Sequence, residues 1–257
     1  MAPETPSISP WLFRHFTSYS EGFLRRHFHT LRLTSDTPAP DGIAGPVIIY
    51  GNHSAWWDPL VSLFLARRFF ADRRSYAPIA AEALQRYRFF SRLGFFGVEG
   101  GTLAGAKQFL STAGAILSEP DSVLWLTPQG RFADVRERPL QFEPGLAHLA
   151  RRVPNVRLVP LALEYGYWEE RLPEILLRFG PALEGDAAIS TEEWNQRLEQ
   201  ALERSMNDLR DLSLRRDPSD FETLISGRAG VGGVYDLWRR AKAFWRGERF
   251  DPAHGAK

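Results

Sequence analysis

The feature that most constrains the fold is a regular alternation of short apolar segments with longer amphipathic ones. Apolar segments bounded by turn residues are predicted to form strands at 46–51, 75–81, 122–128, 156–165 and 174–183. Helical spacing of apolar residues appears between several of them, at about 84–92, 103–118 and 144–152. Strands that alternate with helices predict an α/β fold, here a single domain with a largely parallel mixed sheet flanked by helices.

A long helix is expected after the last of these strands. Residues 190–193, Ser-Thr-Glu-Glu, form a capping box. The apolar positions that follow at helical spacing are Trp194, Leu198, Ala201, Leu202, Leu209 and Leu212. The glycine-rich stretch 227–233 follows no predicted strand and lacks the spacing of either nucleotide fingerprint, so nucleotide binding is not expected there.

Both ends of the chain contain an amphipathic segment. Residues 11–33 place large apolar side chains on one helical stripe with arginines around it, and residues 234–250 repeat this pattern. Aromatic and basic residues together are typical of a helix lying in a lipid headgroup layer, although such a stripe can also cover the protein's own core. The expected organisation is an N-terminal amphipathic helix and linker (1–40), a central α/β domain (41–212), and a C-terminal loop and amphipathic helix (213–257).

Composition limits the partners and the compartment. The 257 residues include 32 basic and 31 acidic side chains, so the chain has no global field that would attract nucleic acid. The absence of cysteine excludes disulfide and thiolate chemistry and fits a reducing compartment. No apolar run of about 18 residues and no signal peptide is visible. We therefore expect a cytoplasmic protein that is peripheral on the inner face of the membrane.

The strongest chemical signal is the segment 52–58, Asn-His-Ser-Ala-Trp-Trp-Asp, between a predicted strand and a helix. There His53 would lie at the carboxyl edge of the sheet, where open α/β sheets bind their ligands. Asp58 falls on the first helical turn and can fold back to accept the Nδ1 proton of His53. The imidazole could then take a proton from a hydroxyl, and the carboxylate would stabilise the imidazolium. The acceptor hydroxyl is then the nucleophile, and no serine is required.

Two other interpretations of this pair remain open. The first is an ordinary capping or hydrogen-bonding pair without catalytic function. The second is a metal site, which is disfavoured because no other histidine lies at ligand spacing from His53. The other histidines are His15, His27, His29, His148 and His254. We expect neither a metal nor a redox cofactor.

Four sequence blocks in a fixed order resemble the glycerolipid acyltransferase family, typified by 1-acylglycerol-3-phosphate acyltransferases. The blocks are Asn52-His53 with Asp58; residues 80–84 with 93–97; residues 127–130 with 139–145; and residues 159–163. The resemblance extends from about residue 45 to about residue 185, inside the central domain. It implies acyl transfer from acyl-CoA or acyl carrier protein to a lysophospholipid or related lipid hydroxyl, with His53 as general base and Asp58 as its partner.

The sequence departs from the family pattern where the acceptor's glycerol phosphate is bound. Gln129 stands where the family usually has glutamate, and Arg131-Phe132 replaces the Thr-Arg pair that usually follows. Glu99 stands near the place of the usual arginine of the second block. These changes leave open a non-phosphate acceptor, such as a glycolipid, an aminolipid or a terpenoid alcohol.

Three arginines of one loop could replace the missing phosphate contacts, because guanidinium groups bind phosphate bidentately. The alternative is a solvated loop in which Asp134 and Glu137 balance them. The predicted substrate-binding residues are Asn52, Gln129, Gly130, Arg131, Arg136 and Arg138. The turn at residues 129–130 is the candidate source of N–H donors for the oxyanion.

Two functions outside acyl transfer to an alcohol are also compatible with these residues. Hydrolysis would use the same base, with water as the nucleophile. A non-catalytic lipid-binding relative is the other, and the presence of both His53 and Asp58 argues against it. Trp56 and Trp57 could line an acyl tunnel or anchor the following helix.

Overall fold

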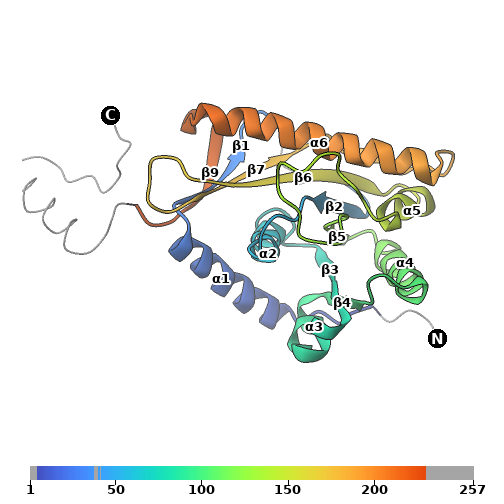
Figure 1. The fold of residues 1–257 in the computed structure, drawn as a ribbon. Helices are drawn as coiled ribbons and strands as arrows, with labels where there is room; N and C mark the ends of the chain where they lie inside the picture. The colour runs from blue at the N-terminus through green and yellow to red at the C-terminus, as the bar shows by residue number, and fades with distance from the viewer. Residues whose placement is uncertain (1–4, 38–39, 41, 230–257) are drawn as a thin grey trace, which may run out of the picture.

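The computed structural model describes residues 5–37, 40 and 42–229. Within them a nine-stranded sheet has the order β4-β3-β5-β2-β6-β7-β1-β9, with β8 paired to β6 (Figure 1). The strands are β1 (Thr30–Thr34), β2 (Val47–Gly51), β3 (Arg74–Ala80), β4 (Phe95–Val98), β5 (Ser122–Leu126), β6 (Arg157–Gly166), β7 (Glu174–Phe179), β8 (Leu183–Glu184) and β9 (Phe221–Ser226). Neighbours from β4 to β6 are parallel, and β7 is antiparallel to β6. The predicted α/β fold with a largely parallel mixed sheet is confirmed.

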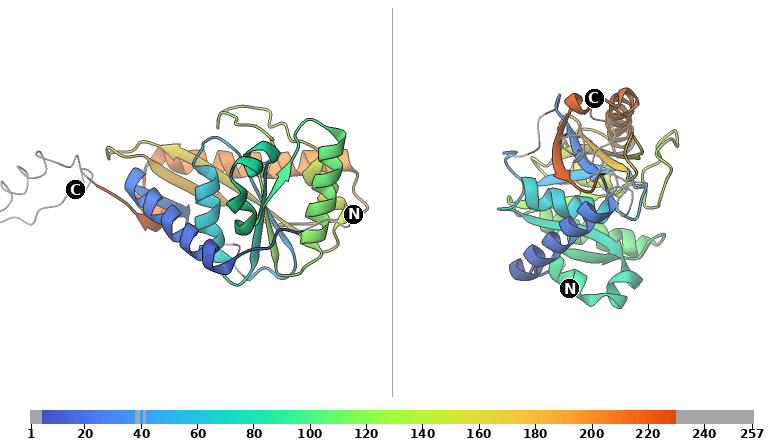
Figure 2. Two further views of the ribbon diagram at one scale, coloured as in Figure 1. Left: turned by 90° about the horizontal axis from the view of Figure 1, so that it is seen from below. Right: turned by 90° about the vertical axis from the view of Figure 1, so that its left-hand side faces the viewer.

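Helices cover both faces of the sheet. They are α1 (Pro10–His27), α2 (Asp58–Phe69), α3 (Ala81–Arg86), α4 (Leu103–Leu117), α5 (Gly145–Arg152) and α6 (Thr191–Arg215), with short 3-10 turns η1 (Arg88–Leu93) and η2 (Pro218–Asp220). Helices α1 and α2 pack on one face, and α4, α5 and α6 pack on the other. Figure 2 shows from two further directions that α6 runs along the side of the sheet away from α1.

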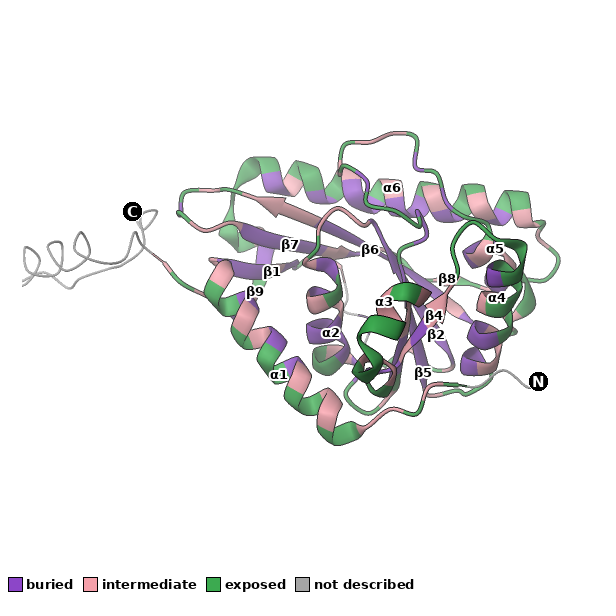
Figure 3. Ribbon diagram, turned by 60° about the horizontal axis from the view of Figure 1, so that its bottom comes forward, coloured by how far each residue is buried: buried purple, intermediate pink, exposed green. Residues whose placement is uncertain are grey.

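Strand β2 shows why both faces of the sheet must be covered by helices. All five of its residues are buried. Successive side chains of a strand point to opposite faces, so Ile48 and Tyr50 enter one core while Val47 and Ile49 enter the other. A strand that is buried on both faces has a continuous apolar run, which explains the strength of its sequence signal. Figure 3 shows the buried strands between helices whose outer surfaces are exposed.

The helix predicted over 11–33 is wrong in its last part. Helix α1 ends at His27, and Thr30–Thr34 form strand β1. Leu31 and Leu33 are buried in the sheet, and they alternate with polar residues in the period of a strand rather than that of a helix. The correct period is hard to detect because the strand has only five residues and directly follows a helix.

Two further strands were not predicted, namely β4 and β9, and one predicted strand is split. The segment 174–183 forms β7 and the short β8, because Pro181 has no N–H to continue the ladder. Strands β1 and β9 pair with each other at one edge of the sheet. The sheet therefore includes residues from outside the range 41–212. The helix predicted at 234–250 lies outside the described residues.

The remaining helical segments agree with the sequence prediction. Segments 103–118 and 144–152 form α4 and α5, while segment 84–92 is divided between α3 and η1. The Ser190 hydroxyl accepts the N–H of Glu193 at 3.1 Å, as expected for the capping box of α6. Among the helices of the described ranges, none combines the length and the apolar character needed to cross a membrane.

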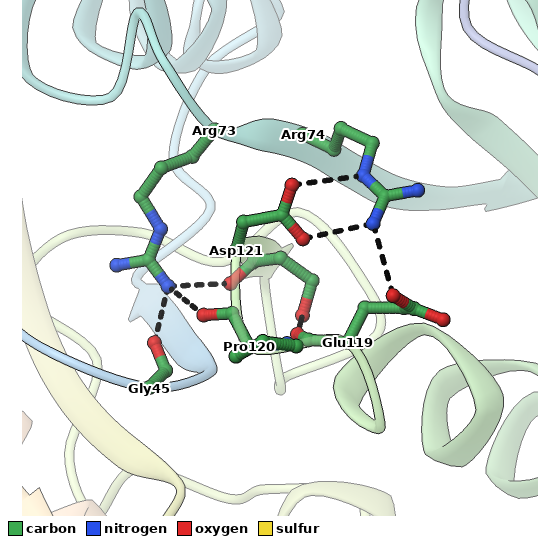
Figure 4. A network of polar contacts seen from close by, with 7 residues as sticks. Gly45, Arg73, Arg74, Glu119, Pro120 and Asp121 are labelled. Carbon is green, nitrogen blue, oxygen red and sulfur yellow. Dashed lines mark hydrogen bonds and ion pairs between the residues drawn. The ribbon is translucent and has the colours of Figure 1, made fainter.

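Arg73 fixes the amino edge of the parallel strands (Figure 4). Its guanidinium donates to the carbonyls of Ile43 at 2.9 Å, Pro120 at 3.0 Å and Ser122 at 3.1 Å, and also to that of Gly45. These carbonyls belong to the segments that lead into β2 and β5. A single side chain thus aligns the starts of β2, β3 and β5, whose opposite ends position the candidate active site.

Candidate active site

The site lies at the carboxyl edge of the sheet, in the turn that joins β2 to α2. Gly51 ends β2, and a Cβ atom there would meet the carbonyl oxygen of Leu161 on β6 at 2.7 Å. Only glycine fits this close approach of two backbones. The turn residues that follow, including His53, therefore leave the sheet directly beside β6.

His53 and Asp58 form the predicted pair. The Nδ1 atom of His53 lies 2.7 Å from the Oδ2 atom of Asp58. The Asp58 side chain is almost fully buried, at 4% exposure, whereas that of His53 is 18% exposed. Asp58 is the first residue of α2, where the helix dipole favours a negative charge. With Nδ1 bound to the carboxylate, Nε2 is the ring nitrogen that can exchange a proton with a substrate.

Tyr165 completes this arrangement and was not predicted. Its hydroxyl donates to the Oδ1 atom of Asp58 at 2.5 Å, while the backbone N–H of Ala55 donates to Oδ2 at 3.1 Å. Burial, and then the charge of Asp58, raise the pKa of Tyr165 far above its ordinary value, so the hydroxyl keeps its proton. Tyr165 lies on β6, and alternation along this strand places it on the same face as Leu161 and Leu163. The alternation along β6 is the one feature of the sequence that indicates which face of the sheet the Tyr165 side chain points to.

Asn52 holds the turn against β6. Its Nδ2 atom donates to the carbonyl of Leu163 at 2.9 Å, and its Oδ1 atom accepts the N–H of Leu163 at 2.9 Å. The side chain thus continues the pairing between β2 and β6 beyond the end of β2. Both groups of its buried amide are engaged by the backbone, which gives Asn52 a positioning role, and its contact with a substrate stays a prediction.

The loop after β5 holds His53 from the other side. The buried Gln129 side chain accepts the His53 N–H at 3.3 Å, and the Ala133 N–H donates to the His53 carbonyl at 2.8 Å. Gln129 therefore contacts the backbone of His53, and its contact with a substrate stays a prediction. The Gly130 N–H donates to the Thr127 carbonyl at 3.0 Å. In this conformation the N–H that was predicted to bind the oxyanion is therefore engaged within the turn.

The three loop arginines are each paired with a carboxylate. The pairs are Arg131 with Glu137, Arg136 with Asp134, and Arg138 with Glu203. Hydrogen bonding from Arg131 holds the pKa of Glu137 below its ordinary value, so this pair stays ionised near neutral pH. Arg138 extends toward α6 and also hydrogen bonds with the backbone of its own loop. Asp134 and Glu137 thus pair with two of the three arginines, as in the alternative of a balanced loop, and phosphate binding by these arginines stays a prediction.

The aromatic ring of Phe132 lies against the imidazole of His53. The ring centroids of Phe132 and His53 are 4.1 Å apart, with an interplanar angle of 32°. Phe132 is 58% exposed, so it forms an apolar surface next to the imidazole. This is the position at which the resembled family usually has arginine. The exposed surface beside His53 is therefore apolar where the resemblance implied a cation.

The two tryptophans of the turn have different environments. Trp57 packs against Phe28 at a centroid distance of 4.9 Å and against Phe23 at 5.4 Å, which anchors the start of α2 to α1. Trp56 is 65% exposed. Core packing of one tryptophan is thus observed. No group of three or more potential metal ligands occurs within the described ranges.

Comparisons with known proteins agree with this geometry. The sequence model of the Acyltransferase family matches residues 28–164. The fold is similar to the crystal structure of the 1-acyl-sn-glycerophosphate (LPA) acyltransferase PlsC from Thermotoga maritima, with a TM-score of 0.52 and 14% sequence identity. The similarity covers 78% of this chain and 79% of that chain. A sequence comparison with curated proteins gives no match.

The match to the Acyltransferase family covers more than half of the chain and includes β2, the β2–α2 turn and most of β6. The chain therefore belongs to the Acyltransferase family and is an acyltransferase. The His53–Asp58 pair lies inside the matched region, at the edge of the sheet where ligands of open α/β folds bind.

Tyr165→Phe should lower kcat about ten-fold, because Asp58 loses one charged hydrogen bond that fixes its position. The KM values for both substrates should stay unchanged. Steady-state kinetics would measure kcat and KM. Tyr76→Phe, a buried tyrosine on β3, is the control, and an unchanged kcat in Tyr165→Phe would contradict the assignment.

Proposed function

We propose that the enzyme transfers a fatty acyl group from a thioester donor to a lipid hydroxyl, with His53 as general base. The observation that carries the proposal is the 2.7 Å contact between His53 and the buried carboxylate of Asp58. Membership of the Acyltransferase family supports acyl transfer. A lipid acceptor is supported by the similar fold of the Thermotoga maritima protein, which is a 1-acyl-sn-glycerophosphate acyltransferase.

In the proposed reaction the Nε2 atom of His53 takes the proton of the acceptor hydroxyl, and the oxygen attacks the thioester carbonyl. The tetrahedral intermediate then collapses to an ester, and the departing thiolate takes the proton back from the imidazolium. Asp58 stabilises the imidazolium, and Tyr165 and the Ala55 N–H hold Asp58 in place. The scheme needs no metal or redox cofactor.

The oxyanion requires N–H donors that are directed at it before the reaction. The turn at Gln129 and Gly130 lies next to His53, but the Gly130 N–H is bonded to Thr127 in this conformation. A flip of this peptide on substrate binding would release the donor. The glycine favours such a change, because its φ of 65° lies in a region that glycine enters without steric cost.

We propose an acceptor without a phosphate near its reacting hydroxyl. Phe132 covers the imidazole where a cation was expected, and Arg131 is paired with Glu137. A phosphate would have to compete with Glu137 for this guanidinium. A neutral or zwitterionic lipid alcohol fits an apolar surface better than lysophosphatidate does. The donor in this proposal is acyl-CoA or acyl carrier protein.

His53→Ala should reduce kcat by about 10²–10⁴-fold through loss of the general base. The fold should be unaffected, because the backbone bonds of His53 to Gln129 and Ala133 do not involve the ring. Transfer of radiolabelled acyl chains would measure the rate, and circular dichroism would check folding. His148→Ala on α5 is the matched control. Wild-type turnover in a folded His53→Ala protein would disprove the base assignment.

The acceptor class can be decided with two lipids that differ in one group, monoacylglycerol and lysophosphatidate. We expect the enzyme to prefer monoacylglycerol in direct competition, because no unpaired cation of the 131–138 loop faces the phosphate. Arg131→Ala should change neither KM by more than about two-fold, since exposed ion pairs contribute little. A preference for lysophosphatidate that depends on Arg131 would instead establish the lysophospholipid alternative.

We also propose that α1 and η1 dock the enzyme on an anionic membrane surface, peripheral on the inner face. Trp11 and Tyr19 on α1 are more than 60% exposed, and Phe16 meets Phe89 of η1 at 5.9 Å. In the part of the chain that the structure describes, Arg14 forms no ion pair. Exposed aromatic side chains beside an unpaired arginine suit a headgroup layer.

Replacing both Trp11 and Tyr19 by serine should reduce co-sedimentation with phosphatidylglycerol-containing vesicles about ten-fold, because two aromatic anchors are lost. Binding of the wild type should also weaken as salt is raised. Leu214→Ser on α6 removes an equally exposed apolar side chain from the other face and is the control. Equal losses in both variants would show that α1 has no special role.

A further inference from the structure

An open groove of about 660 Å³ adjoins the His53–Asp58 pair. It lies between the β2–α2 turn and the segment that joins β6 to β7. The residues that define it here are Ser54, Ala55, Trp57, Tyr165, Arg171 and Leu172. Tyr165 belongs both to the wall of the groove and to the hydrogen bonds of Asp58. A molecule in this groove therefore extends away from the reacting centre.

Arg171 differs from the arginines of the 131–138 loop. It is exposed on the rim of the groove, and within the described ranges it has no ion pair or hydrogen bond. Asp134, which also borders the groove, is already bound by Arg136. The charge of Arg171 on the rim of this groove is thus available to a ligand. The arginines of the 131–138 loop are already paired with carboxylates.

The rest of the lining is mainly apolar, with one unsatisfied polar atom. Trp57, Ala55 and Leu172 supply apolar surface. The Oγ atom of Ser54 is buried and has no hydrogen-bond partner in the described part of the chain. A buried hydroxyl without a partner is costly, and rotation of the Ser54 side chain toward the groove that this residue lines would let an amide of a bound ligand satisfy it. The groove therefore suits a slender chain that contains amides and ends in an anion.

We infer that the groove holds the phosphopantetheine arm of the acyl donor, with Arg171 bound to its phosphate; this assignment rests on the proposed acyl transfer. Acyl-CoA and acyl carrier protein share this arm, which has a thioester at one end, two amides along its length and a phosphate at the other end. A guanidinium binds phosphate oxygens through two parallel hydrogen bonds. Arg171 then selects donors by their phosphate, and the thioester lies beside His53.

The test uses two donors that differ only in the phosphate, acyl-pantetheine and acyl-4′-phosphopantetheine. The wild type should show an apparent KM about ten-fold lower for the phosphorylated donor, as expected for one charged contact. Arg171→Gln should abolish this difference and leave the KM for acyl-pantetheine unchanged. Arg152→Gln is the matched control, because Arg152 is also exposed and unpaired within the described residues but borders a separate groove of about 480 Å³ at the amino edge of the sheet.

Two kinetic outcomes would overturn the assignment. A phosphate preference that persists in Arg171→Gln excludes Arg171 as the phosphate contact. A raised KM for lysophosphatidate with an unchanged donor preference would show that Arg171 serves the acceptor instead.

Calorimetric binding of 4′-phosphopantetheine and pantetheine keeps this inference separate from the proposed function. If the wild type transferred no acyl group from either donor, acyl transfer from thioesters would fail. The groove assignment would still stand if 4′-phosphopantetheine bound about ten-fold more tightly than pantetheine and if Arg171→Gln removed that advantage. Equal binding of the two compounds to the wild type would overturn it.

Discussion

The buried carboxylate of Asp58 is the constraint on which the site depends. A charge that leaves water costs several kcal/mol unless hydrogen bonds and nearby charges replace the lost hydration. Here the replacement comes from the His53 ring, the Ala55 N–H, the Tyr165 hydroxyl and the amino end of α2. These groups belong to the β2–α2 turn, to α2 and to β6. The hydrogen bonds of the carboxylate are complete only when all three elements are in place, so the geometry of the site depends on the fold around it.

The position of His53 follows from the order of strands in the sheet. Strand β2 lies between β5 and β6, so the turn after it can be held from both sides. Asn52 attaches the turn to β6 through the backbone of Leu163, and Gln129 attaches it to the loop after β5. The backbone of the base is therefore fixed before any substrate binds, which reduces the reorganisation that the reaction requires.

The charges around the site are distributed unevenly, and this distribution guides the proposed substrate arrangement. The arginines of the loop after β5 are matched by carboxylates, and Phe132 places an apolar ring against the imidazole. Arg171, on the rim of the groove, has no such partner among the described residues. In our proposals the acceptor approaches over the apolar side, and the anionic end of the donor lies toward Arg171. The two substrates can then meet at Nε2 of His53 without competing for one cation.

The sequence by itself determined the features that depend on neighbours along the chain. The doubly buried strands have strong apolar runs, and five residues of a strand-to-helix turn are enough to bring Asp58 to His53. Strand β1 was missed because it has only five residues and directly follows a helix, and the edge strand β9 was missed because it is short and includes exposed positions. Only the tertiary structure could decide the contacts between distant segments, since no local pattern encodes them. The bond between Tyr165 and Asp58 joins residues 107 positions apart, and those between Asn52 and Leu163 join residues 111 apart.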